Sequence, residues 1–151
     1  MKLKRITMAQ QKEQIDITGY GLNSEQREQV ADLVVERIVN RTVKDNVDWR
    51  GKKFPAYSDE YKASLDFKIA GKGKRVDLQL SGDMLAALKI LKVTQKSILV
   101  GYDKGTEENA RAEGNILGSY GGDPNPKKAR DFLGITDNEL LKIIKYVKKN
   151  V

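Results

Sequence analysis

The chain has 151 residues, of which 39% are hydrophobic and 32% are charged, so it holds enough apolar material for the core of one modest domain. It contains no cysteine and no histidine. This excludes disulfide scaffolds, thiol nucleophiles, imidazole acid–base catalysis and metal sites with cysteine or histidine ligands. No apolar run approaches the ~18 residues of a membrane span, and no apolar signal segment follows the basic first residues. We therefore expect a soluble intracellular protein with no membrane partner.

Lysine and arginine outnumber aspartate and glutamate by 28 to 21, which gives a formal net charge of +7. The excess lies mostly between residues 51 and 100, around Lys72, Lys74 and Arg75, and a second lysine-rich stretch closes the chain. A basic patch can attract phosphate backbones, so these three residues are candidate DNA-facing groups. One alternative function is therefore a small basic DNA-binding protein, and the simplest interpretation is a solvated surface that keeps the protein soluble.

Two elements are predicted in the first third of the chain. Isoleucines that alternate with polar residues indicate a short strand or an extended arm over 13–20. A helix is predicted over 24–45, because Asn23 and Gln26 fit a capping box and apolar residues then recur on one helical face. Those apolar residues are Val30, Leu33, Val34 and Ile38.

The middle of the chain predicts shorter elements. A loop is expected over 46–57, where a glycine and a proline interrupt the periodicity. Ser58 can cap a short helix, and a flexible basic turn at 71–75 then leads into a strand at 76–80. The sequence MLAALK, from residue 84, predicts one or two helical turns.

Two strands over 89–94 and 97–102, joined by a short turn, predict a hairpin, and Thr106 fits the N-cap of the helix that follows. Few, short strands interspersed with helices are typical of an α+β fold. We expect a small antiparallel sheet packed against a long N-terminal helix and a C-terminal helix. This single domain is predicted over 23–151, preceded by an arm or short strand at 1–22.

The segment 118–130 is the most unusual part of the chain, because three glycines and two prolines predict a long loop. Loops of this length are usually functional or disordered. Phe132 and Leu133 follow directly and can plug the core before a T-x-x-E capping box at Thr136 begins the last helix. The loop itself can be ordered by a partner. The apolar face of the last helix comprises Leu140, Ile143, Ile144 and Val147.

No motif for enzymatic chemistry is complete. The turn Gly71-Lys72-Gly73-Lys74 lacks the serine or threonine that follows the lysine of a phosphate-binding loop. Three carboxylate pairs could carry acid–base chemistry or hold Mg²⁺. Each pair, however, lies in or near the first turn of a predicted helix, where negative charge interacts favourably with the helix dipole. They are Asp59 and Glu60, Glu107 and Glu108, and Asp137 and Glu139. We predict a protein that is not an enzyme and has no cofactor or metal, with a Mg²⁺-dependent hydrolase as a minor alternative.

Four stretches of the chain, taken in order, resemble the tailed-phage virion morphogenesis proteins, which are the tail-completion and head–tail joining proteins of the neck. They are Trp49-Arg50-Gly51-Lys52-x-Phe54, Tyr57-Ser58-x-x-Tyr61, Leu78-x-Leu80-Ser81-Gly82-Asp83-Met84-Leu85-x-x-Leu88 and Pro126-Lys127-Lys128-Ala129-Arg130-Asp131-Phe132-Leu133-Gly134-Ile135-Thr136. The resemblance covers roughly residues 48–146. Two positions depart from it: Asp131 stands where many relatives have proline, and Ser81 where many have threonine.

The resemblance implies a non-enzymatic virion protein of the phage neck, a tail-completion or tail-terminator protein that acts as a ring subunit. The partners it implies are copies of itself (a homo-oligomeric ring such as a hexamer), the neighbouring connector and tail-tube proteins, and DNA in the channel. Because a closed ring needs two different contact surfaces on each subunit, we expect the loop 118–130 and residues 1–20 at subunit interfaces. The candidate interface residues are Tyr120, Asp123, Asn125, Lys127, Lys128 and Arg130. The candidate anchor of the last helix comprises Phe132, Leu133 and Gly134.

Overall fold

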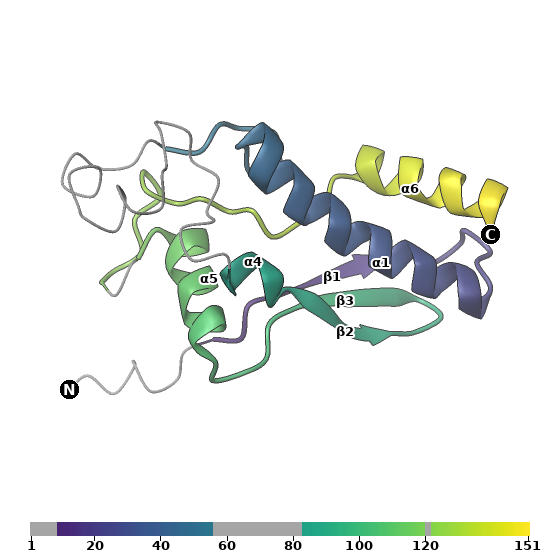
Figure 1. The fold of residues 1–151 in the computed structure, drawn as a ribbon, viewed down its shortest axis with the longest axis horizontal. Coiled ribbons are helices and arrows are strands. Elements are labelled where there is room, and N and C mark those ends of the chain that lie inside the picture. Colours follow the sequence, from purple (N-terminus) through teal and green to yellow (C-terminus); the bar gives the residue numbers. More distant parts are fainter. Residues whose placement is uncertain (1–8, 56–82, 120–121) are drawn as a thin grey trace.

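Figure 1 shows the fold in a computed structural model, which describes residues 9–55, 83–119 and 122–151. Several of the predicted features lie outside the described residues: the helix from Ser58, the basic turn with Lys72, Lys74 and Arg75, the strand at 76–80, and Tyr120.

Three short strands form an antiparallel sheet in the order β1-β3-β2. They are β1 (Lys12–Asp16), β2 (Lys89–Val93) and β3 (Ser97–Gly101). β2 and β3 form the predicted hairpin, and β1 pairs with the other edge of β3, where Ile15 lies opposite Ile98. Both isoleucines are buried, so the alternation in the first strand does mark its core-facing side.

The long helix α1 (Ser24–Asn40) begins at the predicted capping box. The Asn23 side chain accepts a hydrogen bond from the Gln26 backbone N–H, and the Gln26 side chain accepts one from the Asn23 N–H. The helix continues as a π-helical turn, η2 (Arg41–Asp45), and ends at Asn46, whose φ of 56° is left-handed. The predicted helix is confirmed in its bounds, and only its wider last turn was not predicted.

Three further helices occupy predicted positions: α4 (Asp83–Ala86), α5 (Glu107–Leu117) and α6 (Asp137–Asn150). The Thr106 side chain caps α5, as predicted, and Thr136 begins α6 with the predicted capping box. Each cap satisfies a backbone N–H that the first helical turn leaves without a partner, which is why these starts are legible in the sequence.

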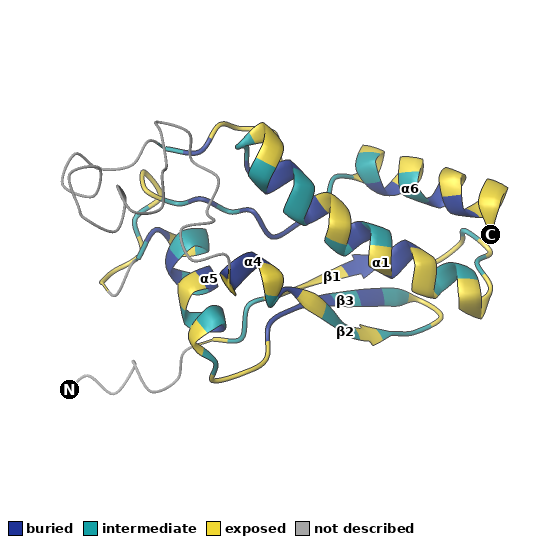
Figure 2. Ribbon diagram, in the orientation of Figure 1, coloured by how far each residue is buried: buried dark blue, intermediate teal, exposed yellow. Residues whose placement is uncertain are grey.

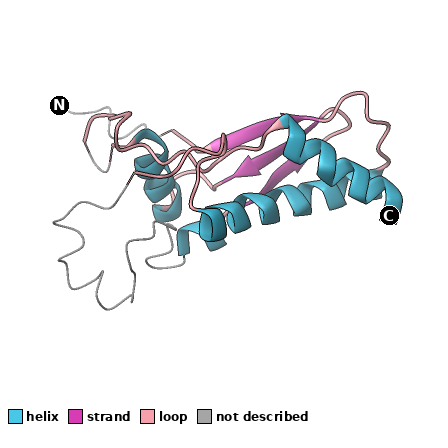
Figure 3. Ribbon diagram, turned by 90° about the horizontal axis from the view of Figure 1, so that it is seen from above, coloured by secondary structure: helices cyan, strands magenta, loops and turns pink. Residues whose placement is uncertain are grey.

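α1 lies along one face of the sheet, where it contacts β2 and β3, and α6 packs against α1 (Figures 1 and 3). α4 and α5 contact each other beyond the end of the sheet. Figure 2 shows that buried positions follow the surfaces where these elements meet. Burial of each large aliphatic side chain there contributes about 1.5–3 kcal/mol. The expected α+β architecture is confirmed.

Candidate assembly loop and its anchor

The predicted loop folds back onto the C-terminal end of α5. The backbone N–H of Asn125 donates to the carbonyl of Leu117 at 2.9 Å, and that of Arg130 donates to the carbonyl of Asn115 at 2.6 Å. The described part of the loop contains neither helix nor strand, as predicted. It is nevertheless seated on α5 by backbone hydrogen bonds, which define its position without a regular element.

Gly118 is the residue at which the loop leaves α5. Its φ of +68° is left-handed, which lets it end the helix. A Cβ at this position would overlap the carbonyl oxygen of Asn125 and lie 2.7 Å from the backbone nitrogen of Ala129. Glycine is therefore needed both for the helix end and for the close approach of the loop.

We expect the substitution Gly118→Ala to lower the free energy of unfolding by about 2 kcal/mol or more, because left-handed strain of about 1–2 kcal/mol adds to the overlap with the loop. Gly105→Ala is the matched control, since Gly105 has a φ of +73° with no atom near the added Cβ. We expect Gly105→Ala to be destabilised only by the strain of the left-handed backbone. Urea unfolding measures both variants. Equal losses in the two would show that the loop is not seated on α5.

The candidate interface residues that the structure describes differ in burial. Asn125 is half-buried, and its side chain accepts a hydrogen bond from the Lys127 backbone N–H at 3.0 Å. Arg130 is only 8% exposed, and its Nε donates to the carbonyl of Pro55 at 3.2 Å. Arg130 therefore holds the loop to its own chain. The exposed candidates are Asp123, Lys127 and Lys128.

All three candidate anchor residues are buried directly before α6. Phe132 is fully buried and meets the Tyr102 ring edge-on, with 6.5 Å between the ring centroids. Leu133 is 6% exposed. A Cβ on Gly134 would lie 2.8 Å from Cγ of Trp49, so the backbone here runs directly against the indole ring. The chain before α6 is thus clamped between two aromatic side chains.

Trp49 belongs to a loop whose shape is set by one carboxylate. Asp48 accepts hydrogen bonds from the backbone N–H groups of Arg50 and Lys52 at 2.9 and 2.8 Å. The Trp49 backbone N–H donates to the carbonyl of Asp131 at 3.0 Å, and the Arg50 guanidinium lies 5.4 Å from the indole centroid. Burial raises the pKa of the Asp131 carboxyl, partly offset by hydrogen bonds. The loop 48–52 and the anchor residues 132–134 therefore pack together, and we call this contact the joint.

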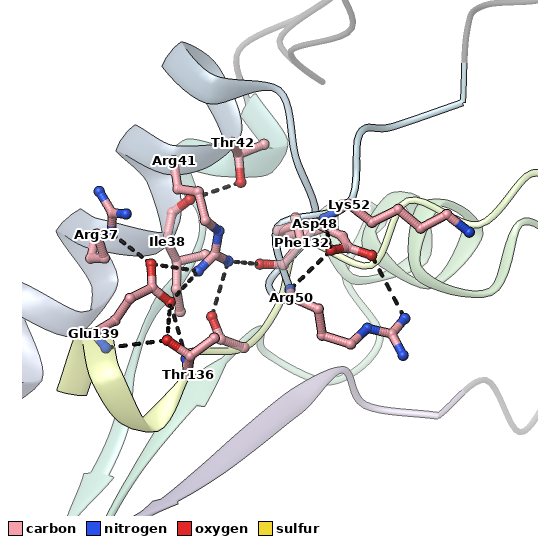
Figure 4. A network of polar contacts seen from close by, with 11 residues as sticks. Arg37, Ile38, Arg41, Thr42, Asp48, Arg50, Lys52, Phe132, Thr136 and Glu139 are labelled. Carbon is pink, nitrogen blue, oxygen red and sulfur yellow. Dashed lines mark hydrogen bonds and ion pairs between the residues drawn. The ribbon is translucent and has the colours of Figure 1, made fainter. Parts of the chain in front are cut away.

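Arg41 ties the C-terminal end of the long helix to this joint (Figure 4). Its Nη2 donates to the carbonyls of Phe132 at 2.6 Å and Gly134 at 3.0 Å, and its Nη1 donates to the Glu139 carboxylate at 3.1 Å. Its side chain is only 3% exposed, whereas Arg37, which reaches the same carboxylate at 2.7 Å, is 44% exposed. Burial lowers the pKa of Arg41, and the negative charge of Glu139 opposes this shift. An arginine remains charged in such a setting.

Glu139 makes two kinds of contact at the start of α6. Its carboxylate accepts the Thr136 backbone N–H at 3.0 Å, which completes the capping box, and it also accepts hydrogen bonds from Arg37 and Arg41. Burial raises the pKa of Glu139, but the backbone hydrogen bond and the two arginines outweigh this, so the pKa lies below its ordinary value. The carboxylate is therefore ionised at neutral pH.

Asn109 holds the N-terminal segment on α5. Its buried side chain accepts the Gln11 backbone N–H at 2.7 Å and donates to the carbonyl of Ala9 at 3.1 Å. The Tyr102 backbone N–H donates to the carbonyl of Gln11 at 3.0 Å. Residues 9–17 of the expected arm are therefore engaged in this chain's own fold, and they are not a free extension.

Neither Arg41 nor Asn109 is among the functional residues predicted from the sequence. A signal exists in both cases, because Arg41 continues the apolar stripe three residues after Ile38, and Asn109 lies three residues before the buried Ala112. A polar side chain on the core-facing side of a helix must find partners inside the fold. Such positions are visible in a sequence, but their partners are not.

No family model, no curated protein and no solved structure matches this chain. Across the described ranges, no three acidic side chains gather into a possible metal site. No helix in the part of the chain that the structure describes is long and apolar enough to cross a membrane. The carboxylate pairs at 107–108 and 137–139 lie in first helical turns, and the pair at 59–60 lies outside the described residues.

Proposed function

We propose that this protein is a structural component of a tailed-phage neck, a tail-completion or tail-terminator protein that forms a ring at the head–tail junction. One observation carries the proposal: two of the stretches that resemble this family contact each other. Trp49 of the first stretch packs on Gly134 of the last, and its backbone N–H binds the carbonyl of Asp131. Motifs that are distant in the sequence thus form one joint, which favours a shared fold over chance similarity.

The loop before this joint suits a role in assembly. It is seated on α5 at one end and held by the buried Phe132 at the other, while Asp123 and Lys127 remain exposed. Loops on a rigid support commonly carry binding function. In the proposed ring, this loop contacts a neighbouring copy or the adjoining connector and tail-tube proteins, and the channel passes DNA without base-specific contacts. The protein then resides in the virion.

Deletion of the gene from the phage that carries it tests the proposal. We expect lysates that contain filled heads and separate tails, because the two halves lack their junction, and electron microscopy counts the joined and unjoined particles. Supplying the wild-type protein from a plasmid should restore joined particles, which controls for effects on neighbouring genes. Deletion particles whose heads are firmly joined to intact tails would contradict the proposed function.

A further inference from the structure

The outer face of α1 carries an acidic stripe, defined by Glu25, Gln29, Asp32 and Glu36. Counted from Glu25, the other three residues lie four, seven and eleven positions further along the chain, so all four line one side of the helix. All four are exposed, and the buried residues of α1 lie on its opposite side. Within the described residues, none of the three carboxylates forms an ion pair.

The outer face of α6 carries a basic stripe, defined by Asn138, Lys142, Lys145 and Lys149. Its members have the same offsets of four, seven and eleven positions, and all four are exposed. The buried residues of α6 lie on the opposite side of the helix. None of the three lysines has a carboxylate partner among the residues that the structure describes. Each stripe is about 16 Å long, from a rise of ~1.5 Å per residue.

The two stripes lie on neighbouring helices that run antiparallel. The end of α1 meets the start of α6 where Arg37 binds Glu139, and the Gln26 side chain reaches the carbonyl of Val151 at the other end. No ion pair joins the stripes within the described part of this chain. Each subunit therefore presents two unlike, complementary charged surfaces, neither of which neutralises the other internally.

The occupant that best fits the basic stripe is a protein surface. The acidic stripe of a second copy matches the basic stripe in sign, in length and in the spacing of its members. Apolar side chains also gather here: three of the four large hydrophobic residues that are exposed within the described ranges belong to α6 or follow it directly. They are Leu141, Tyr146 and Val151, with exposed fractions of 37%, 58% and 41%.

We propose that the acidic stripe of one copy of this chain docks on the basic stripe of the next copy. The contact joins two different surfaces, so it is head-to-tail, and repetition of it closes a ring or extends a filament. The inference rests on the proposed function only in that it names the surfaces of the ring contact. Exposed ion pairs contribute little individually, so the stripes steer and orient the subunits, while the flanking apolar side chains supply buried area.

Two charge-reversed variants test the contact. The first, E25K/D32K/E36K, makes the α1 face basic, and the second, K142E/K145E/K149E, makes the α6 face acidic. Wild-type protein should self-associate at low salt, and added salt should weaken this association. Each variant alone should bind itself about 10- to 100-fold more weakly, because attraction becomes repulsion across the contact. Light scattering and analytical ultracentrifugation measure the masses.

Mixing the two variants gives the decisive result. The basic α1 face of the first fits the acidic α6 face of the second, and their other faces also match, so an equimolar mixture should regain the wild-type mass. The chain that carries all six substitutions should self-associate as well. The matched control is K92E/K96E/K104E, which reverses three exposed lysines outside α6 and should associate like the wild type. Circular dichroism confirms that every variant is folded.

Any of four mass measurements would overturn the inference. They are a wild type that stays monomeric at low salt, single variants that associate as well as the wild type, a mixture that stays monomeric, and a control that associates as weakly as the single variants. Binding of duplex DNA that only the second variant loses would assign the basic stripe to nucleic acid and would also overturn it. The proposed function has a separate test. If immunogold labelling places the protein at the neck while the variants associate like the wild type, the proposed function holds and the ring forms through another surface.

Discussion

Replacement of Arg41 by methionine is expected to lower the free energy of unfolding by about 3–5 kcal/mol, because removal of one partner from a buried ionic network leaves the others without compensation. The carbonyls of Phe132 and Gly134 would lose their donor, and Glu139 would lose the more buried of its two arginines. Methionine keeps most of the side-chain volume, so the loss reports the polar contacts. Urea unfolding followed by circular dichroism measures it.

Arg37→Met is the matched control for this substitution. Arg37 binds the same Glu139 carboxylate at 2.7 Å, but its side chain is 44% exposed, and exposed ion pairs contribute only about 0–1 kcal/mol. We expect a loss of less than about 1 kcal/mol for this variant. Similar losses for the two arginines would mean that burial of Arg41 and its two carbonyl partners contribute little to the joint.

Phe132→Ala is expected to cost about 3–5 kcal/mol, because truncation of a buried aromatic side chain loses its transfer free energy and leaves a cavity. Phe132 is fully buried and packs on Tyr102, and its carbonyl is one of the two that Arg41 binds. Loss of the ring should also loosen the loop before it. We therefore expect faster tryptic cleavage at Lys127 and Lys128 in this variant, read by mass spectrometry, together with a lower midpoint in urea.

Tyr102→Phe separates the contribution of the ring to stability from that of its hydroxyl group. The Tyr102 hydroxyl is buried without a hydrogen-bond partner in the described structure, and burial raises its pKa. Removal of an unsatisfied buried hydroxyl should leave stability unchanged or raise it by about 1 kcal/mol. A Phe132→Ala variant as stable as the wild type, or a Tyr102→Phe variant that unfolds far more easily, would contradict this account of the core.

Local patterns determined most of the regular elements. The starts of α1, α5 and α6 followed from Asn23, Thr106 and Thr136, because a capping side chain binds a backbone N–H only two or three residues further on. The hairpin followed from two short runs of strand-forming residues joined by a short turn. The exposed residues of the candidate loop, such as Asp123, were also predictable, since a polar segment rich in glycine and proline stays at the surface.

Only the tertiary structure decided which distant groups meet. Nothing local to Arg41 names the carbonyls near Gly134 as its partners, and nothing local to Arg130 shows that its guanidinium turns inward to Pro55. The need for glycine at Gly118 likewise depends on a loop that returns several residues later. The physical reason is the same in each case. Capping and periodicity act within one or two turns of chain, whereas partners of buried polar groups are set by how the helices and the sheet pack.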